Sequence, residues 1–200
     1  MNLLELLQNQ LSDDVVDQLS TSIRADKETT VEAANGVFAT LVSALSRNAA
    51  KPEAGNALLS ALDRDHDGSI LNDVMGLIGG GQPRAKASNG LGILEHILGG
   101  KTNNVVQMVS KTSGLDFLKS AELMKMLAPI VMGTLGQAKK QNGFDLGGLA
   151  SILSGTVSQA AKKREGMGLI EKVLDADGDG NIMDDIAGMG MKVLGGLFRK

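Results

Sequence analysis

Two twelve-residue segments, 63–74 and 175–186, carry three aspartates at alternate positions followed by a glycine. This spacing is that of the first half of an EF-hand calcium loop. There, the carboxylates at loop positions 1, 3 and 5 converge on one ion, and the glycine at position 6 allows a sharp turn. Ca²⁺ is a hard cation that takes about six to eight oxygen ligands. Both loops are therefore predicted to bind Ca²⁺, which gives two ions for the whole chain.

The second half of each loop departs from the EF-hand pattern. Position 12, where an EF-hand has a bidentate glutamate, is Val74 in the first loop and Ile186 in the second. An aspartate stands one position earlier, and a shift of one residue turns a side chain by about 100° on a helix. The sequence therefore predicts EF-hand-like loops with a different closing geometry, in which position 7 supplies a backbone carbonyl. The predicted metal ligands are Asp63, Asp65, Asp67, Ser69, Asp73, Asp175, Asp177, Asp179, Asn181 and Asp185.

The alternative interpretation of these loops is an acidic turn before a helix. Aspartate is a good N-cap, and Asp and Gly are frequent in turns. A turn needs only one such aspartate, however, and three alternating carboxylates repel one another without a cation, so metal binding is favoured. Mg²⁺ fits less well because it retains water and prefers fewer protein ligands. His66, at position 4 of the first loop, is expected to be solvent-exposed.

The composition indicates an all-α protein. Of the 200 residues 42% are hydrophobic, but the chain has only four Phe and neither Trp nor Tyr, so the core must consist of aliphatic residues, Met and Ala. Ala, Leu, Met, Lys, Gln and Glu favour helices, and no segment shows the alternation of a strand. The 26 glycines predict short helices that often end at glycine. The absence of cysteine excludes disulfides and thiol chemistry.

The chain aligns with itself and is predicted to be a tandem duplication of a short-helix bundle. A shift of 90 residues places 3–7 on 93–97 and Asp26 on Asp116, whereas the loops align at a shift of 112. The second half therefore has 22 extra residues. The predicted domains are a first helical repeat at 1–80 that contains loop 63–74, a glycine-rich linker at 81–89, and a second repeat at 90–200 that contains loop 175–186.

Each half is predicted to contain the same series of helices. The long third helix shows an apolar period near 3.6 residues, and Pro129 is expected to bend its second copy or mark its early turn. In the extra segment, 142–164, Asp145 is expected to cap a short helix. The predicted ranges are Leu3 to Leu11, Asp13 to Ile23, Lys27 to Arg47, Ala54 to Leu62 and Asn72 to Ile78, then Ile93 to Leu98, Asn103 to Lys111, Ser120 to Gln141, Gly168 to Leu174 and Asp184 to Phe198.

Three features together resemble a known family. They are the opening Asn2-Leu3-Leu4-Glu5-Leu6-Leu7, the aspartate loops that continue into Asp-Val/Ile-x-Gly, and Gly-Gly-Leu-Ala-Ser-Ile-Leu at 147–153. They are similar to the YidB-like bacterial proteins of unknown function, and the resemblance covers most of the chain. It implies a compact helical bacterial protein. It carries no activity, so no catalytic residue is transferred.

No set of residues indicates an enzyme. The chain has two histidines, His66 and His96, and lacks both the Gly-x-Ser-x-Gly elbow and a phosphate-binding loop. With a net charge of −3 and no basic helix, nucleic acid is not an expected partner. No apolar stretch approaches the length of a membrane span, and the N-terminus lacks the pattern of a secretory signal. A cytoplasmic location is expected, and secretion without such a signal is the alternative.

The leading hypothesis is a non-enzymatic calcium-binding helical protein in which the metal is structural or conformational. The runner-up is a helical interaction or scaffold protein whose loops are only acidic turns, and a DNA-binding helical module is a weaker third. A protein partner or self-association would use apolar helices rich in methionine, because such faces repack readily. The methionines concerned are Met124, Met126, Met132, Met183, Met189 and Met191.

Overall fold

The computed structural model describes residues 2–79 and 89–163, and these residues form helices only, which confirms the all-α prediction. No helix in these ranges is both long and apolar enough to cross a membrane. The predicted helices at 168–174 and 184–198 lie outside the described residues. The elements are α1 Leu3–Gln8, α2 Asp13–Ile23, α3 Lys27–Ala49, α4 Pro52–Arg64, the 3₁₀ helix η1 Ser69–Asp73, α5 Val74–Ile78, α6 Gly90–Leu98, the 3₁₀ helix η2 Gly99–Lys101, α7 Thr102–Ser113, α8 Phe117–Asn142 and α9 Leu146–Lys163.

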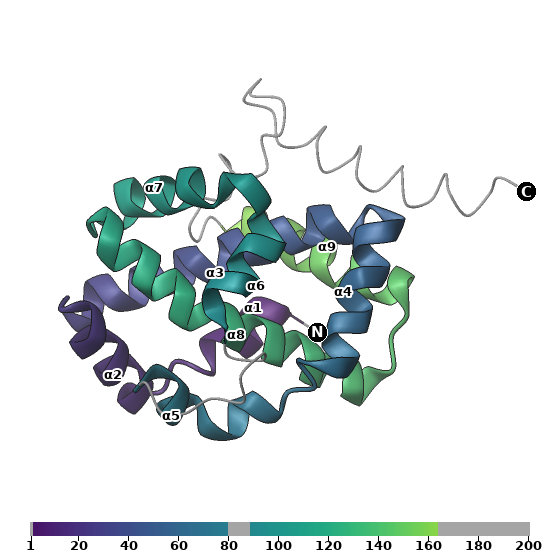
Figure 1. The fold of residues 1–200 in the computed structure, drawn as a ribbon, viewed down its shortest axis with the longest axis horizontal. Helices are drawn as coiled ribbons and strands as arrows, with labels where there is room; N and C mark the ends of the chain where they lie inside the picture. Colours follow the sequence, from purple (N-terminus) through teal and green to yellow (C-terminus); the bar gives the residue numbers. More distant parts are fainter. Residues whose placement is uncertain (1, 80–88, 164–200) are drawn as a thin grey trace, which may run out of the picture.

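The two longest helices, α3 and α8, pack against each other and cross in the middle of the molecule (Figure 1). Each begins at an aspartate N-cap. Asp26 Oδ1 accepts a hydrogen bond from Thr29 N at 2.8 Å, and Asp116 Oδ1 accepts one from Lys119 N at 2.9 Å. These bonds satisfy backbone donors that the first turn leaves free. The α8 helix continues through Pro129 without interruption, so the proline ends no element.

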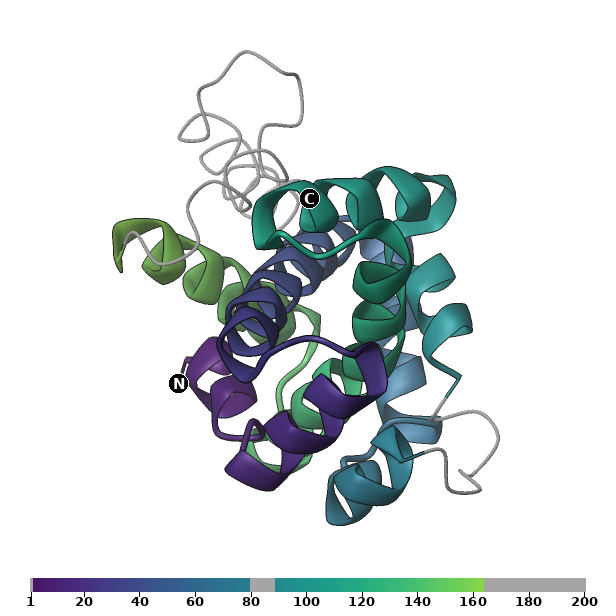
Figure 2. The ribbon, with the colours of Figure 1, turned by 90° about the vertical axis from the view of Figure 1, so that its left-hand side faces the viewer.

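The helices of the two halves interlock around α3 and α8. The α9 helix packs on α3, while α4 contacts α8 as well as α3. The first helix of each half also contacts the long helix of the other half, since α1 contacts α8 and α6 contacts α3. Figure 2 shows α2 and α7 on either side of the central pair. The predicted halves, 1–80 and 90–200, therefore share their packing surfaces wherever the chain is described.

One hydrophobic cluster fills the space between these helices and draws on both halves. Its fully buried members include Leu3, Phe38, Leu41, Leu127 and Ile130. The predicted partner surface on methionine-rich helices fails for α8, because its methionines belong to this core. Met124, Met126 and Met132 have exposed fractions of 0%, 8% and 3%. Met183, Met189 and Met191 lie outside the described residues.

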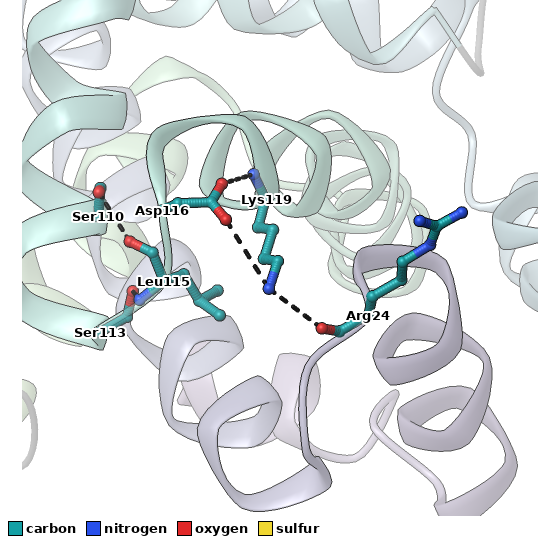
Figure 3. Close-up of polar contacts among 6 residues, drawn as sticks. All are labelled: Arg24, Ser110, Ser113, Leu115, Asp116 and Lys119. Carbon is teal, nitrogen blue, oxygen red and sulfur yellow. Dashed lines mark hydrogen bonds and ion pairs between the residues drawn. The ribbon is translucent and has the colours of Figure 1, made fainter.

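The corners that precede α3 and α8 lie next to each other and have the same construction (Figure 3). Each ends the preceding helix with a left-handed residue, Arg24 at φ 53° and Gly114 at φ 75°. Lys119 joins the corners, because its Nζ donates to Arg24 O at 3.1 Å and lies 3.7 Å from Asp116 Oδ2. The second corner is further closed by Ser110 Oγ, which donates to Leu115 O at 2.7 Å.

The segment at 142–164 forms a longer helix than predicted. Asp145 caps it as expected, since its Oδ1 accepts a hydrogen bond from Gly148 N at 2.9 Å. The helix then continues to Lys163. Leu149, Leu153 and Val157 follow one face at helical spacing and are buried. The contact of this face with α3 stabilises the additional turns, which the local sequence alone does not require.

Candidate functional site

The first aspartate loop joins α4 to η1 and turns sharply at a glycine. Asp63 lies in the last turn of α4, and Asp65 is its C-cap. Gly68, at loop position 6, has φ 90° and ψ −7°, a left-handed conformation that favours glycine. The left-handed residue expected at position 6 is therefore present.

Three aspartate side chains of this loop, those of Asp63, Asp67 and Asp73, have separate partners in the structure. Asp63 forms an ion pair with Lys139 of α8. Asp67 Oδ1 accepts a hydrogen bond from Ser69 N at 3.0 Å. Asp73 Oδ1 accepts one from Gly76 N at 2.9 Å and so caps α5. The described residues contain no group of three or more acidic, histidine or cysteine side chains that could hold a metal ion.

The residue at position 12 explains part of this arrangement. Val74 is 9% exposed and belongs to the hydrophobic core, so position 12 faces the interior and not the loop centre. Asp73, one residue earlier, is exposed and faces its own helix N-terminus. Position 12 therefore offers no ligand, and Asp73 is held as the N-cap of α5. The second loop, with Asp175, Asp177, Asp179, Asn181 and Asp185, lies outside the described residues.

The loop backbone rests directly on α8 because two glycines on that helix leave room for it. A Cβ on Gly136 would lie 1.6 Å from His66 O, and a Cβ on Gly133 would lie 2.6 Å from Ile70 Cγ2. The approach is also close from the loop side, where a Cβ on Gly68 would lie 2.8 Å from Gln137 Cβ. The loop of the first half is thus seated on the long helix of the second half.

His66 contradicts the expectation of a solvent-exposed side chain. It is 7% exposed, and its Nδ1 has no hydrogen-bond partner among the described residues. Burial lowers the pKa of the imidazole, because a low-dielectric environment disfavours the charged form. The sequence prediction was wrong because it treated the loop as isolated. Since the loop is seated on α8, position 4 is turned inward.

Behind His66 lies a cavity of about 560 Å³ between α4 and α6. Its apolar lining comes from four helices and includes Leu45 of α3, Leu58 of α4, Ile93 and Ile97 of α6 and Met132 of α8. Its polar lining is Asn48, Ser60, Arg64, Asp65, His66, Asn89 and His96. Both histidines of the chain therefore border one cavity.

Sequence reasoning missed this cavity, and only one feature pointed toward it. Gly133 and Gly136 interrupt the apolar face of α8 one helical turn apart. Paired glycines inside a long helix indicate that another backbone approaches closely. Nothing in the sequence indicated that the approaching backbone was that of the aspartate loop.

The sequence comparison places the chain in a family. The model of a bacterial family of proteins of unknown function, DUF937, matches residues 5–138, which is more than half of the chain. The chain belongs to this family. The DUF937 match includes loop 63–74 and ends within α8, so α9 and loop 175–186 follow it. No curated protein and no solved structure matches the chain.

Proposed function

We propose that this DUF937 protein is a non-enzymatic calcium-binding protein in which loop 63–74 holds one ion and loop 175–186 holds another. One observation carries the proposal for the first loop. Its position 6 glycine, Gly68, has a left-handed backbone, as the sharp turn at this position of an EF-hand loop requires. The aspartates at positions 1, 3 and 5 are the hard oxygen ligands that Ca²⁺ prefers.

Calcium binding would replace the present partners of two loop aspartates with the ion. Asp63 would release Lys139, and Asp67 would move from Ser69 N to the ion. Because Lys139 belongs to α8 and the loop also rests on α8, ion binding would change the link between α4 and α8. This arrangement favours a structural or conformational role for the metal.

Calorimetric titration of the chelator-stripped full chain with Ca²⁺, and with Mg²⁺ as control, tests the proposal. We expect two calcium sites. Asp65→Asn should remove one and Asp177→Asn the other, whereas Glu53→Gln, which changes an exposed acid at the other end of α4, should leave both. No heat and no change in Tm at millimolar Ca²⁺ would contradict calcium binding.

Lys139→Met provides a second, independent readout. The ammonium competes with the ion for Asp63, so its removal should tighten calcium binding at the first loop. Lys140→Met is the matched control, because Lys140 is an exposed neighbour on the same helix. If Lys139→Met left the calcium affinity unchanged, Asp63 would not be a ligand.

A helical interaction protein with purely structural acidic turns is the second candidate. It is favoured by the local partners of two aspartates: Asp67 accepts a hydrogen bond from Ser69 N within the turn, and Asp73 caps α5. The exposed Leu118 (78%) and Leu91 (54%) could contact another protein. This candidate predicts that Ca²⁺ changes neither stability nor helicity. The weaker DNA-binding alternative would require salt-dependent retention on DNA.

We also propose that the chain is a tandem duplication, and the positions of its caps and the order of its helices support this. The caps Asp26 and Asp116 stand 90 residues apart, and so do the left-handed residues Arg24 and Gly114. Helices α1 to α4 and α6 to α9 also follow each other in the same order of short, medium, long and medium. On this proposal, α9 corresponds to α4 instead of being the extra segment that the alignment of the loops indicated. The YidB-like resemblance of 147–153 belongs to the second copy.

A further inference from the structure

Helix α5, which follows the first aspartate loop, lies beside α2 (Figure 1) and contacts both α2 and α8. Val74 is buried and Leu77 is half-buried against the hydrophobic cluster, whereas Met75 is exposed. The helix ends beside Gln18 of α2, because a Cβ on Gly79 would lie 3.6 Å from Gln18 Nε2. The short segment that leaves this loop is thus held against the second helix of its own half.

The residues that leave the second aspartate loop repeat this segment. With the loops aligned at a shift of 112, residues 73–77, Asp-Val-Met-Gly-Leu, fall on residues 185–189, Asp-Ile-Ala-Gly-Met. Ile186 and Met189 stand at two positions that α5 packs against the core, and Ala187 stands at the position that α5 exposes. Two segments with the same apolar positions are expected to use similar apolar surfaces, since apolar side chains gain free energy by leaving water.

The α7 helix offers a surface like the one that α5 covers on α2. The two helices align at a shift of 90, and both pack on α3 and α8. The additional partner of α2 is α5, whereas the additional partners of α7 among the described elements, α6 and η2, directly precede it. Val15 of α2 is buried, but Val105 at the aligned position of α7 is half-buried. Met108, also half-buried, replaces Gln18, so α7 is the more apolar helix at the position where α5 ends on α2.

The length of the chain permits residues 185–191 to reach α7. Helix α9 ends at Lys163. About twenty residues separate it from Ile186, and at about 3.3 Å per residue they can span about 65 Å. A domain of about 160 residues is only about 40 Å across, so every face of the helical core is within reach.

We propose that residues 185–191 pack on α7 against Val105 and Met108, as α5 packs on α2. The apolar residues of this segment face α7, and Ala187 faces solvent. The contact is with α7 and not with α3, because α9 already packs along α3. It attaches the second aspartate loop to the helical core. This inference rests on the proposed tandem duplication and is independent of calcium binding.

Cysteine cross-linking in the full chain tests the contact, because the natural sequence has no cysteine. The test pair is Met108→Cys with Met191→Cys. It aligns with Gln18→Cys and Gly79→Cys of the α2–α5 contact, which is the positive control. Gln107→Cys with Met191→Cys is the matched negative control, since Gln107 is exposed and is turned by about 100° from Met108. In the presence of chelator, dibromobimane should cross-link the test pair within one chain at least about tenfold faster than the negative control, because a docked segment has a high effective concentration at its partner.

Methyl NMR of the cysteine-free full chain provides a second readout. Met189→Asp should shift the methyl signals of Val105 and Met108 and make them more accessible to a soluble paramagnetic agent, because a buried, unpaired carboxylate is costly and releases the segment. Ala187→Asp is the matched control. It should leave both signals unchanged, since the aligned Met75 is exposed.

Three outcomes would overturn the proposal. They are equal cross-linking rates for the test pair and the negative control, a product that joins only different chains, and unchanged Val105 and Met108 signals in Met189→Asp. The second outcome would place the segment on another copy of the chain. Because chelator is present throughout, a failure here is independent of the calcium titration, and a failed titration would leave the cross-link unchanged. The duplication of the described helices would also stand, because their caps and order do not involve residues 185–191.

Discussion

The contact between α1 and α9 is closed, whereas the space between α6 and α4 is open. Leu3 of α1 and Ile93 of α6 are aligned positions in the two halves of the sequence. Leu3 is fully buried, and its N–H donates to Thr156 Oγ1 of α9 at 3.3 Å. Ile93 faces the cavity instead. The two similar apolar helices, α1 and α6, therefore differ in how closely they are packed, and the difference lies in their partner helices.

The partner helices differ where the contact would form. The α9 helix presents Leu153, Thr156 and Val157, which are all buried. The end of α4 carries Arg64 and Asp65 and leads directly into the loop seated on α8. Charged residues do not cover an apolar helix closely, since burying them without partners is costly.

The largest expected effect comes from truncating the aligned pair Leu3 and Ile93. Leu3→Ala should lower the free energy of unfolding by about 2–5 kcal/mol, because it leaves a void in a closed contact. Ile93→Ala should cost about 2 kcal/mol or less, since its side chain already borders empty space and loses fewer contacts. Chemical denaturation measures both. Equal costs would show that the two regions are packed alike.

Gly136→Ala should have the next largest effect. The new Cβ would lie 1.6 Å from the backbone oxygen of His66, so the loop must move away from α8. We expect a loss of about 1–3 kcal/mol in the free energy of unfolding and altered His66 NMR signals. Ser46→Ala, at the aligned position of α3, is the control and should cost less than about 1 kcal/mol. An unchanged His66 signal would contradict the seating of the loop.

Thr156→Val tests the closed contact with a nearly isosteric change. It removes the hydroxyl that accepts from Leu3 N and should lower the free energy of unfolding by about 1 kcal/mol. Ser151→Ala, at an exposed position of the same helix, should change it by no more than about 0.5 kcal/mol. Thermal and chemical denaturation should agree on this order. A larger loss in Ser151→Ala would mean that the hydrogen bond does not explain the effect.

The smallest expected effect is a gain. Ala61→Leu should raise the free energy of unfolding by about 0.5–1 kcal/mol, because the added side chain partly fills the cavity and buries apolar surface. Ala25→Leu, at a half-buried position that does not border the cavity, is the control and should show no such gain. A loss in Ala61→Leu would indicate that the gap between α4 and α6 is already filled.

Much of the helical framework could be predicted from local sequence. The range of α2, Asp13–Ile23, was predicted to the residue, because a run with helical apolar spacing begins at aspartates, which favour a helix start. The cap at Asp145 followed from the same local rules. The length of α9 did not, since contacts with distant helices stabilise its additional turns.

The candidate site was likewise predictable only in part. The turn at Gly68 was predictable because glycine is the residue that adopts a left-handed backbone without strain. The inward position of His66 was not, because it depends on the glycines of α8, which lie about seventy residues further along the chain. The sequence also left open whether the aspartates prefer a metal to the partners that the fold offers them.

By itself, the sequence determined an aliphatic all-helical protein with two aspartate loops and matching halves, because composition, periodicity and capping act over a few residues. Only the tertiary structure decided that the halves interlock, that the first loop is seated on α8 and that a cavity lies between α4 and α6. These features depend on which apolar faces meet. Such a choice is made by complementary packing between distant residues, which local patterns do not encode.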